Sequence, residues 1–578
     1  MQTRIWQDVA VDEAQVARTA AALNLPPVIA RLLCQRGLGD PETAQRFLQP
    51  SLDHLHDPFR LAGMREAVDR INAAIANRER ITIHGDYDVD GITSTIILRR
   101  AIELLGGDVD HFVPDRLRDG YGLQPASIDR LHAAGARVIV SVDCGIRAGE
   151  AAQRARELGV DLIITDHHEP DGTLPAALAV INPKRSDCSY PEKSLAGVGV
   201  ALKLVQALLG SDSRWSSLLP HFVKIAAIGT LADVVPLTGE NRVIAHYGLA
   251  SLSRGPHATG LAALLEESGL LGKKVNGFHL GFVLGPRVNA AGRMQSADLA
   301  LDLLLIRGQD AESRNRARVL AQRLSAENTK RQDQEAAILA SAKRSVDNDL
   351  EVGAHNILVV ADENWHRGVV GIVASKLVDA YHKPALVLSI EDGVAHGSAR
   401  SIPAFDMLAA LESCSDLFLR FGGHRQAAGV TLEAARVGEL RRRLSAWADE
   451  RLSPEDLIPR LTIHSPLPLR EISTAVLESL ERLGPFGPAN PKPVFRAAPV
   501  ALMGKPRTVK ERHLKLLFRQ DGRTLPAIHW RAADRSDYLN ANRDGLELAY
   551  SLDAREYQGM QTTELTVADV RMPAGVCA

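Results

Sequence analysis

Short apolar runs alternate with longer amphipathic stretches through the first half of the chain. The runs "RITIHGDYD", "ARVIVSVDCG", "VDLIITDHH" and "VKIAAIGTLAD" are rich in β-branched residues, and Ala- and Leu-rich stretches separate them. Alternating strand and helix signals predict βαβ units and a parallel sheet with helices on both faces. Ligands of such sheets bind beyond the carboxyl ends of the strands, where each of these runs becomes acidic.

The pattern changes at Gln309. From Gln309 to Val352 the chain contains neither Gly nor Pro and is rich in strong helix formers, which predicts a long helix between two domains. The runs "NILVVADENW" and "PALVLSI" then restart the strand pattern and predict a second, smaller α/β domain. The Pro-bearing stretch "SPEDLIPRLTIHSPLPL" that follows is typical of a linker.

In the carboxy-terminal part, short strands follow one another without long helices between them. One face of "GLELAYSLDA" carries Leu546, Leu548, Tyr550 and Leu552, and "HLKLLF" and "ELTVADVRM" are further strands. Residues 482–523 include ten Lys or Arg and two acids. A small, basic β-barrel is therefore predicted, and such a module suits single-stranded nucleic acid.

Length and composition are those of a soluble protein with several domains. At roughly 100–200 residues per domain, the 578 residues suggest three or four domains. No apolar run approaches the ~20 residues of a membrane span, and the amino terminus has no secretory apolar segment, so we expect a cytoplasmic protein. The five cysteines form no CxxC pair, which argues against structural zinc. The net charge of -2 does not discriminate between partners.

Carboxylates and imidazoles gather at the ends of the four apolar runs. They are Asp86, Asp88 and Asp90 after the first run, Asp143 after the second, Asp166, His167 and His168 after the third, and Asp233 in the fourth. Each Asp alone could equally be a helix N-cap or loop residue, and each His a structural residue. At neighbouring strand ends they would converge on one crevice, where close carboxylates need cations.

Oxygen ligands with one or two imidazoles suit Mn²⁺ or Mg²⁺. The carboxylates suffice for two ions that share one Asp. Two such ions hydrolyse phosphate esters, because they lower the pKa of a bound water and hold the attacking and leaving oxygens. An EF-hand is the alternative for "HGDYDVDG" alone, but the following Glu and the flanking helices are missing. The predicted chemistry is therefore that of a phosphoesterase.

Several motifs resemble those of a known family. "HGDYDVDGITS", "SVDCG", "TDHH" and "GTLADVVPL" resemble the four metal motifs of the DHH phosphoesterases. "VPDRLRDGYGL", "GPRVNAAGR", "ENTKRQ", "WHRGVVGIVASKL", "HGSARS" and "FGGHRQAAG" resemble the bacterial RecJ single-strand-specific exonucleases, and "LGPFGPANPKPVF" is similar to the start of their oligonucleotide-binding barrel. The likeness covers almost the whole chain, in order.

The resemblance implies a domain plan of the α/β class. A parallel-sheet DHH catalytic domain would be joined by a long helix to a smaller α/β (DHHA1-type) domain, followed by a C-terminal β-barrel (OB-fold). The expected ranges are 1–50 for an N-terminal segment, 51–308 for the catalytic domain, 309–350 for the helix, 351–452 for the DHHA1-type domain and 453–578 for the barrel.

The resemblance also implies roles for the acidic and histidine residues. The expected metal ligands are Asp88, Asp90, Asp143, His168 and Asp233, with Asp143 bridging two Mn²⁺ or Mg²⁺ ions, and with Asp86 and His167 as further candidates for ligation or catalysis. His84 and Asp166 are candidates for orienting a ligand, as metal-bound histidines usually require. The resemblance leaves open whether Asp86, His84 and His167 bind directly.

Other positions match those that would hold the DNA. Arg116, Ser398 and Arg400 would bind a 5′ phosphate, and Tyr121 would stack on a base. Arg287, and less strongly Arg293, would contact the backbone near the metals, and His424 would be either a polar contact or a structural residue. The stretch "WHRGVVGIVASKL" would begin a helix whose exposed amides offer an anion site.

The implied activity is a metal-dependent exonuclease that degrades single-stranded DNA from 5′ to 3′ into 5′-mononucleotides, in DNA repair and recombination. A DHH phosphodiesterase for short RNA or cyclic dinucleotides is disfavoured by the length and the barrel. A non-catalytic strand-binding subunit is disfavoured by the complete Asp and His set. By the same resemblance we expect a monomer, with a single-strand-binding protein or a helicase as partner.

Overall fold

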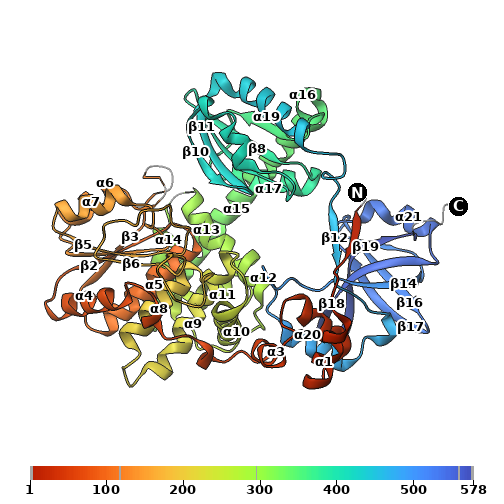
Figure 1. Ribbon diagram of the computed structural model, residues 1–578, viewed down its shortest axis with the longest axis horizontal. Coiled ribbons are helices and arrows are strands. Elements are labelled where there is room, and N and C mark those ends of the chain that lie inside the picture. Colours follow the sequence, from red (N-terminus) through yellow and green to blue (C-terminus); the bar gives the residue numbers. More distant parts are fainter. Residues whose placement is uncertain (1–3, 116–118, 121, 295, 558–559, 574–578) are drawn as a thin grey trace.

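The computed structural model describes residues 4–115, 119–120, 122–294, 296–557 and 560–573. Three units lie around a common centre (Figure 1): a large α/β unit on the left (the first unit), a smaller α/β unit at the top (the second unit) and a β-rich unit on the right (the barrel unit). None of the helices in the described part of the chain has the length and apolarity needed to span a bilayer.

The first unit contains the predicted parallel sheet, with the strand order β3-β2-β4-β5-β6. The strands are β2 (Ile81–Gly85), β3 (Val109–Phe112), β4 (Val138–Val142), β5 (Asp161–Thr165) and β6 (Ala179–Ile181). Strands β2 and β4 are buried throughout, because helices cover both faces of the sheet. One face packs on α4 (Met64–Ala76), α5 (Val89–Leu104) and α8 (Gly197–Leu209), and the other on α6 (Pro125–Ala133) and α7 (Gly149–Glu157).

The prediction of a fourth strand at "VKIAAIGTLAD" is wrong, because this run is the second half of helix α9 (Trp215–Ala232). An unbroken apolar run indicates burial but does not distinguish a core strand from a core helix. Helix α9 packs between α5, α8 and α10 (Gly239–Arg254), and a helix in such a position is apolar on most of its surface. Asp233 therefore follows a helix and not a strand.

The predicted long helix is confirmed as α15 (Ala311–Asn348), a 38-residue helix that Asp310 caps through its side chain. Its first half packs on the helices that end the first unit, and its second half on the second unit (Figure 1). The helices that end the first unit are α11 (Thr259–Glu267), α12 (Gly277–His279), the π-helical turn η3 (Leu280–Leu284), α13 (Gly285–Met294) and α14 (Asp298–Leu304).

The second unit contains a mixed sheet with the strand order β10-β11-β9-β8-β7, as expected for a smaller α/β domain. Its strands are β7 (Leu358–Asp362), β8 (Ala385–Glu391), β9 (Val394–Arg400), β10 (Phe418–His424) and β11 (Ala427–Glu433). Only β7 and β8 pair in parallel, and helix α17 (Val370–Tyr381) connects them. Helices α16 (Leu350–Gly353), α18 (Met407–Glu412) and α19 (Val437–Arg451) complete this unit.

The predicted barrel is confirmed as a five-stranded closed sheet. Its strands are β14 (Phe495–Leu502), β16 (His513–Gln520), β17 (Arg523–His529), β18 (Leu546–Tyr557) and β19 (Met560–Arg571). Strand β14 pairs with both β18 and β16 and so closes the barrel. Leu546, Leu548, Tyr550 and Leu552 are all buried, as their alternation predicts. Strand β15 (Arg507–Val509) and helices α20 (Thr474–Leu483) and α21 (Ser536–Ala541) surround it.

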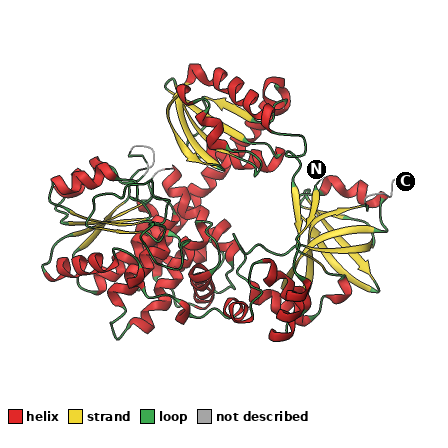
Figure 2. Cartoon of the chain, viewed as in Figure 1, coloured by secondary structure: helices red, strands yellow, loops and turns green. Residues whose placement is uncertain are grey.

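The prediction of a linker at "SPEDLIPRLTIHSPLPL" is partly wrong, because two segments of this stretch are strands. Strand β12 (Arg460–Ile463) pairs in parallel with β1 (Ile5–Asp8), and β13 (Ser465–Pro466) pairs with β14. Local pattern could not show this, because the partner of β12 lies at the opposite end of the sequence. The N-terminal helices α1 (Glu13–Leu23), α2 (Pro27–Gln35) and α3 (Pro41–Leu48) also pack on the barrel core, so both chain ends form one unit (Figure 2).

Candidate metal centre and strand cavity

The register of the parallel sheet brings the acidic strand ends to one edge. Gly85, the last residue of β2, pairs with Val142, and Val142 pairs with Thr165. Each of these residues is followed directly by an aspartate, namely Asp86, Asp143 and Asp166. The three carboxylates therefore leave the sheet side by side, as the sequence predicts.

Asp143 occupies the middle of this edge and is 2% exposed. Its φ of 62° lies in the left-handed region, which Asp and Asn tolerate better than most residues. Its Oδ1 atom is buried and makes no hydrogen bond to any described residue. The first residue of α8, Gly197, approaches so closely that any Cβ there would collide with the Asp143 carboxylate.

His167 lies among three of these carboxylates. Its Nε2 atom is 3.2 Å from Asp143 Oδ1, 3.7 Å from Asp233 Oδ2 and 3.9 Å from Asp90 Oδ2. This Nε2 is buried and, like Asp143 Oδ1, has no hydrogen bond within the described chain. Several lone pairs thus face one small volume, as in a cation site. The resemblance implies that His168 is a ligand and leaves open whether His167 binds directly.

Three groups of side chains are close enough to hold a cation. They are Asp143 with His167 and His168, Asp90 with His167 and Asp233, and Asp86 with Asp88 and Asp143, the ligand atoms of each group lying within 4.8 Å of one another. Because the groups overlap, neighbouring ions would share ligands. This donor set of oxygens and imidazoles fits Mn²⁺ or Mg²⁺.

Two helix N-termini hold the carboxylates in place. Asp88 caps α5, where its Oδ1 accepts hydrogen bonds from the amides of Asp90 and Gly91 at 2.9 and 3.1 Å. Both oxygens of Asp90 accept from the first amides of α8, those of Gly197 and Val198, at 2.7 Å each. The positive ends of these helices stabilise negative charge at the site.

Asp166 points away from the shared volume and orients the histidines. Its Oδ1 accepts from the backbone amide of His167 at 2.7 Å and lies 2.7 Å from Nδ1 of His168. Burial alone would raise the pKa of Asp166, but the contact with His168 and backbone amides hold it below its usual value. The same contact raises the pKa of His168 against the effect of burial. The contact at Nδ1 fixes the orientation of the His168 ring, as second partners of metal-binding histidines usually do.

Without a bound cation, burial and mutual repulsion disfavour the ionised forms of the clustered aspartates. Burial, reinforced by neighbouring aspartates, raises the pKa values of Asp90 and Asp143 well above the usual range. Burial and Asp88 raise the pKa of Asp233 to about 7, and burial lowers that of His167 to about 4. Bound cations would favour the ionised aspartates and so lower their pKa values.

His84 is buried nearby, with its Nδ1 3.7 Å from Cys144 Sγ, and is in none of the three groups.

A cavity of about 440 Å³ opens over the carboxylates. Asp86, Asp88, Asp90 and Asp233 line it together with Asn289, Arg293 and Arg400. Arg400 comes from strand β9, so the second unit reaches the carboxylate cluster. Sequence reasoning missed Asn289, whose only signal is its place in "GPRVNAAGR". Arg287 donates to Val283 O and Ser325 Oγ and is not among the described lining residues, whereas Arg293 is.

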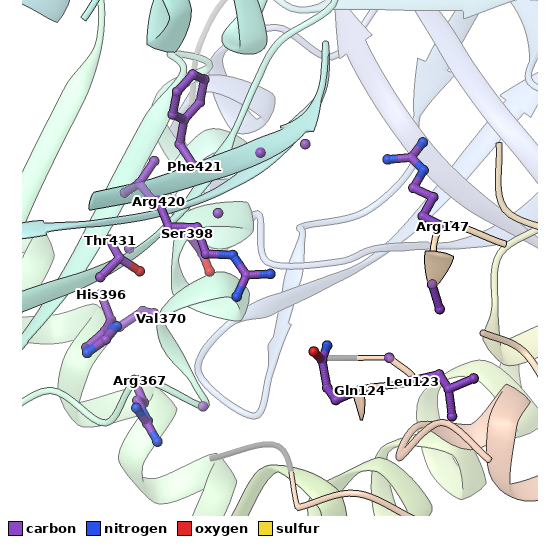
Figure 3. Close-up of a pocket in the computed structure, with 18 of the residues that line it drawn as sticks. Leu123, Gln124, Arg147, Arg367, Val370, His396, Ser398, Arg420, Phe421 and Thr431 are labelled. Carbon is purple, nitrogen blue, oxygen red and sulfur yellow. The ribbon is translucent and has the colours of Figure 1, made fainter. Parts of the chain in front are cut away.

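A second cavity, of about 750 Å³, separates the first and second units. In Figure 3, Leu123, Gln124 and Arg147 form one wall, and Arg367, His396, Ser398, Arg420 and Phe421 belong to the other. The first turn of α17 packs close to Ser398 and Arg400. A Cβ built on Gly371, in that turn, would lie 3.3 Å from Ser398 Oγ and 3.6 Å from Arg400 Nη2.

Three predicted positions are not among the described lining residues of these cavities. Arg116 and Tyr121 lie outside the described residues. His424 is exposed at the end of β10, and the described lining of the large cavity includes Gly422 and Gly423 but not His424. Phe421 and the glycines of "FGGHRQAAG" therefore supply the wall where that motif meets the cavity.

Comparison with known proteins identifies the family. The chain matches models of the DHH family, N-terminal domain (residues 80–230), the DHHA1 domain (354–450) and the RecJ OB domain (463–569). It is 35% identical over 588 residues to the single-stranded-DNA-specific exonuclease RecJ of Escherichia coli, covering 98% of this chain and 99% of that protein. The Bacillus subtilis protein of the same name is 38% identical, with 98% and 70% covered.

A solved structure agrees over the same length. RecJ from Thermus thermophilus in complex with Mn²⁺ superimposes with a TM-score of 0.82 at 31% identity, covering 98% of this chain and 80% of that one. Its Mg²⁺ complex gives a TM-score of 0.77. The chain therefore belongs to the RecJ family of single-stranded-DNA-specific exonucleases.

Proposed function

We propose that this protein is a metal-dependent exonuclease that degrades single-stranded DNA from its 5′ end into 5′-mononucleotides. The observation that carries the proposal is the proximity of Asp143 Oδ1 and His167 Nε2 inside a cluster of aspartates, two buried atoms that make no hydrogen bond to the described residues. Such a cluster is costly unless cations bind to it. Family membership supplies the substrate class.

The cluster would hold two Mn²⁺ or Mg²⁺ ions. The residues that would hold them are those of the three overlapping groups, and four of these, Asp86, Asp88, Asp90 and Asp233, line the cavity. Such ions, when bound, lower the pKa of a water and neutralise the charge of the phosphate. Asp143 and His167 each belong to two of the three groups, and Asp143 is the one that both ions would share, because a carboxylate has two oxygens to offer.

The protein's own side chains position the DNA. Asn289 and Arg293 line the cavity over the carboxylates and would hold the backbone of the strand there. Ser398, Arg400 and the first amides of α17 would bind the terminal 5′ phosphate, since charged donors and a helix N-terminus together favour a dianion.

With the 5′ end held there, the phosphodiester between the first and second nucleotides would lie over the carboxylates. Water attacks this phosphorus and the bond to the 3′ oxygen of the first nucleotide breaks. The remaining strand again ends in a 5′ phosphate, so the same pocket would accept it in the next cycle.

Single-strand specificity would come from the narrowness of the cavity. The first and second units touch closely at Gly368, where Arg293 donates to the carbonyl at 3.3 Å and a Cβ would lie 2.6 Å from Arg293 O. Walls held together in this way would admit one strand, and backbone contacts would bind it without reading bases. Affinity would fall as the salt concentration rises, because phosphate contacts dominate.

From family membership alone we further propose that the protein acts as a monomer with a single-strand-binding protein or a helicase as partner. Cross-linking of the purified protein would reveal a dimer, and co-purification with each candidate would reveal the partner.

The proposed activity is tested with one oligonucleotide labelled separately at each end. With Mn²⁺ or Mg²⁺ we expect the 5′ label to leave at once as a mononucleotide and the 3′-labelled strand to shorten stepwise, while a blunt duplex resists. A ladder from the 5′-labelled strand would contradict the polarity. Digestion that continues in EDTA would contradict the need for metal.

A further inference from the structure

Two phenylalanines are strongly exposed beside the metal centre. Phe278 is 63% and Phe282 is 71% exposed, and Val234, which directly follows Asp233, is 67% exposed. Among the large hydrophobic residues of the described chain, only Leu419 on β10 is also more than 60% exposed. Exposed apolar groups scattered singly need no explanation, whereas a cluster next to an active site points to a ligand.

The local sequence explains why these rings face outward. Gly277, Gly281 and Gly285 recur every fourth residue along α12, η3 and α13 and face the last turn of α9, because Cβ atoms on them would lie 3.5 to 3.8 Å from Leu231 and Ala232. Leu280 and Leu284 are buried in the core. Phe278 and Phe282 are left on the outer face, one helical turn apart.

The pair is a preformed aromatic stack. The two rings are stacked, with centroids 5.1 Å apart and an interplanar angle of 22°. The helix that carries Phe278 begins with a capping box, in which Asn276 and His279 each accept a hydrogen bond from the other's backbone amide. A capped helix presents its side chains with little loss of freedom on binding.

The position of the pair connects the metal centre with the barrel unit. The last turn of α9, on which this segment packs, continues directly into Asp233. A Cβ built on Gly277 would also lie 3.7 Å from Phe486 O, and Phe486 belongs to the segment that leads into the barrel. Figure 1 places α12 at the edge of the first unit that faces the barrel unit.

The charge of the segment favours a nucleic acid. Residues 268–297 contain Lys273, Lys274, Arg287, Arg293 and His279 and no acid. Aromatic rings among cations form the usual platform for single strands, because every base has a flat face and every nucleotide carries a phosphate. Lys274 Nζ lies 3.7 Å from Glu481 Oε1, and an exposed pair of this kind is weak enough to leave the lysine accessible to a phosphate.

We propose that Phe278 and Phe282 form a stacking platform for bases of the single strand between the metal centre and the barrel. The inference rests on the proposed function and adds a binding site to it. Bases downstream of the cleaved nucleotide would stack on the exposed rings while Lys273 and Lys274 attract the backbone. The contact would be independent of sequence.

Equilibrium binding of a fluorescent 20-nucleotide thymidine strand tests this platform. The Asp143→Asn variant serves as the parent, so that the strand stays intact with Mg²⁺ present, and fluorescence anisotropy gives the affinity. Adding Phe278→Leu and Phe282→Leu keeps apolar bulk but removes the flat faces, and we expect affinity to fall on the order of 10-fold. Phe59→Leu, an exposed phenylalanine on η2 (Pro58–Arg60), is the matched control and should not alter it.

A strand of the same length with abasic sites separates base stacking from other effects. The parent should bind the abasic strand more weakly than the thymidine strand. The two Leu substitutions should not lower the affinity for the abasic strand any further. If the two Leu substitutions lowered the affinity for both strands equally, or for neither, the platform would be overturned while the nuclease assignment stayed intact. A parent that binds neither strand would overturn the proposed function and the platform with it.

A fluorescent variant supplies a second, direct measurement. Phe282→Trp keeps an aromatic face, so we expect it to bind the thymidine strand like the parent, with quenching of the added tryptophan fluorescence on saturation. The parent's own tryptophan signal is subtracted. Absence of quenching with a fully bound strand would contradict stacking at this position.

Discussion

At the scale of single residues, the candidate metal centre depends on atoms whose surroundings are unfavourable without a cation. Asp143 combines a left-handed backbone, nearly complete burial and an Oδ1 without a hydrogen bond in the described chain. Burial and neighbouring carboxylates both raise its pKa. A residue in this state persists where ligand binding repays the unfavourable energy.

Asp143→Asn should separate metal binding from folding. Asn has the same shape and tolerates the left-handed backbone, so the fold is kept while one buried negative charge is removed. In EDTA we expect a Tm equal to or ~2–4 °C above that of the unchanged protein, because repulsion among the carboxylates decreases. Mn²⁺ should raise the Tm of the unchanged protein and leave the variant unaffected.

Differential scanning calorimetry with and without Mn²⁺ measures both effects. The same Mn²⁺-dependent rise in the variant would show that Asp143 is not a ligand. Loss of nuclease activity alone would not decide this question, because many changes abolish catalysis.

At the scale of elements, the ends of strands and helices assemble the site. Strand register brings Asp86, Asp143 and Asp166 together, while Asp233 arrives from the end of a helix. The sequence predicts the first three correctly, because a parallel sheet aligns its carboxyl ends. The prediction of a strand before Asp233 is wrong, because buried helices and buried strands both appear in the sequence as unbroken apolar runs.

The end of β9 and the start of α17 form the proposed phosphate pocket. Arg400→Ala should lower the ratio of kcat/KM for a 5′-phosphorylated strand to that for a 5′-hydroxyl strand on the order of 10-fold, because a charged hydrogen bond to phosphate is lost. The ratio is measured by steady-state digestion of the two strands.

The control for this prediction is Arg425→Ala. Arg425 is exposed in the same unit and donates to Pro403 O. An unchanged ratio in Arg400→Ala, or an equal decrease in the control, would contradict the pocket.

At the scale of the whole molecule, one buried arginine joins the units. Arg242 on α10 is 2% exposed and donates to Phe47 O of the N-terminal helices at 2.8 Å. It also donates to Leu483 O and Arg482 O of α20, both at 2.9 Å. Its guanidinium lies 3.7 Å from the centre of the Phe47 ring. One side chain thus donates hydrogen bonds from the first unit to two segments of the barrel unit.

Arg242→Met should loosen this junction. Three carbonyls would lose the hydrogen bonds from Arg242, although Leu483 O would keep one from Asn490 Nδ2, and we expect the loss to cost on the order of 3 kcal/mol of free energy of unfolding. Hydrogen exchange should increase in α3 and α20 before it increases in the parallel sheet. The control is Arg254→Met at the exposed end of the same helix. Unchanged exchange at both helices would refute the role of Arg242.

Much of this protein follows from the sequence alone. The parallel strands, the helix α15, the closed barrel and the acidic strand ends are predicted, because short-range periodicity and composition report burial and secondary structure directly. Phe278 and Phe282 show the limit of that information. In the sequence they are two apolar residues among others, and only packing places the glycines against α9 and the rings in solvent.

The tertiary structure alone decided which side chains meet. It placed His167 Nε2 among three carboxylates, made the element before Asp233 a helix, and paired β1 with β12 across most of the chain length. It also brought Arg400 from the second unit to the metal centre. The physical reason is that each of these contacts joins residues far apart in sequence, so their proximity depends on the packing of whole elements and leaves no local pattern.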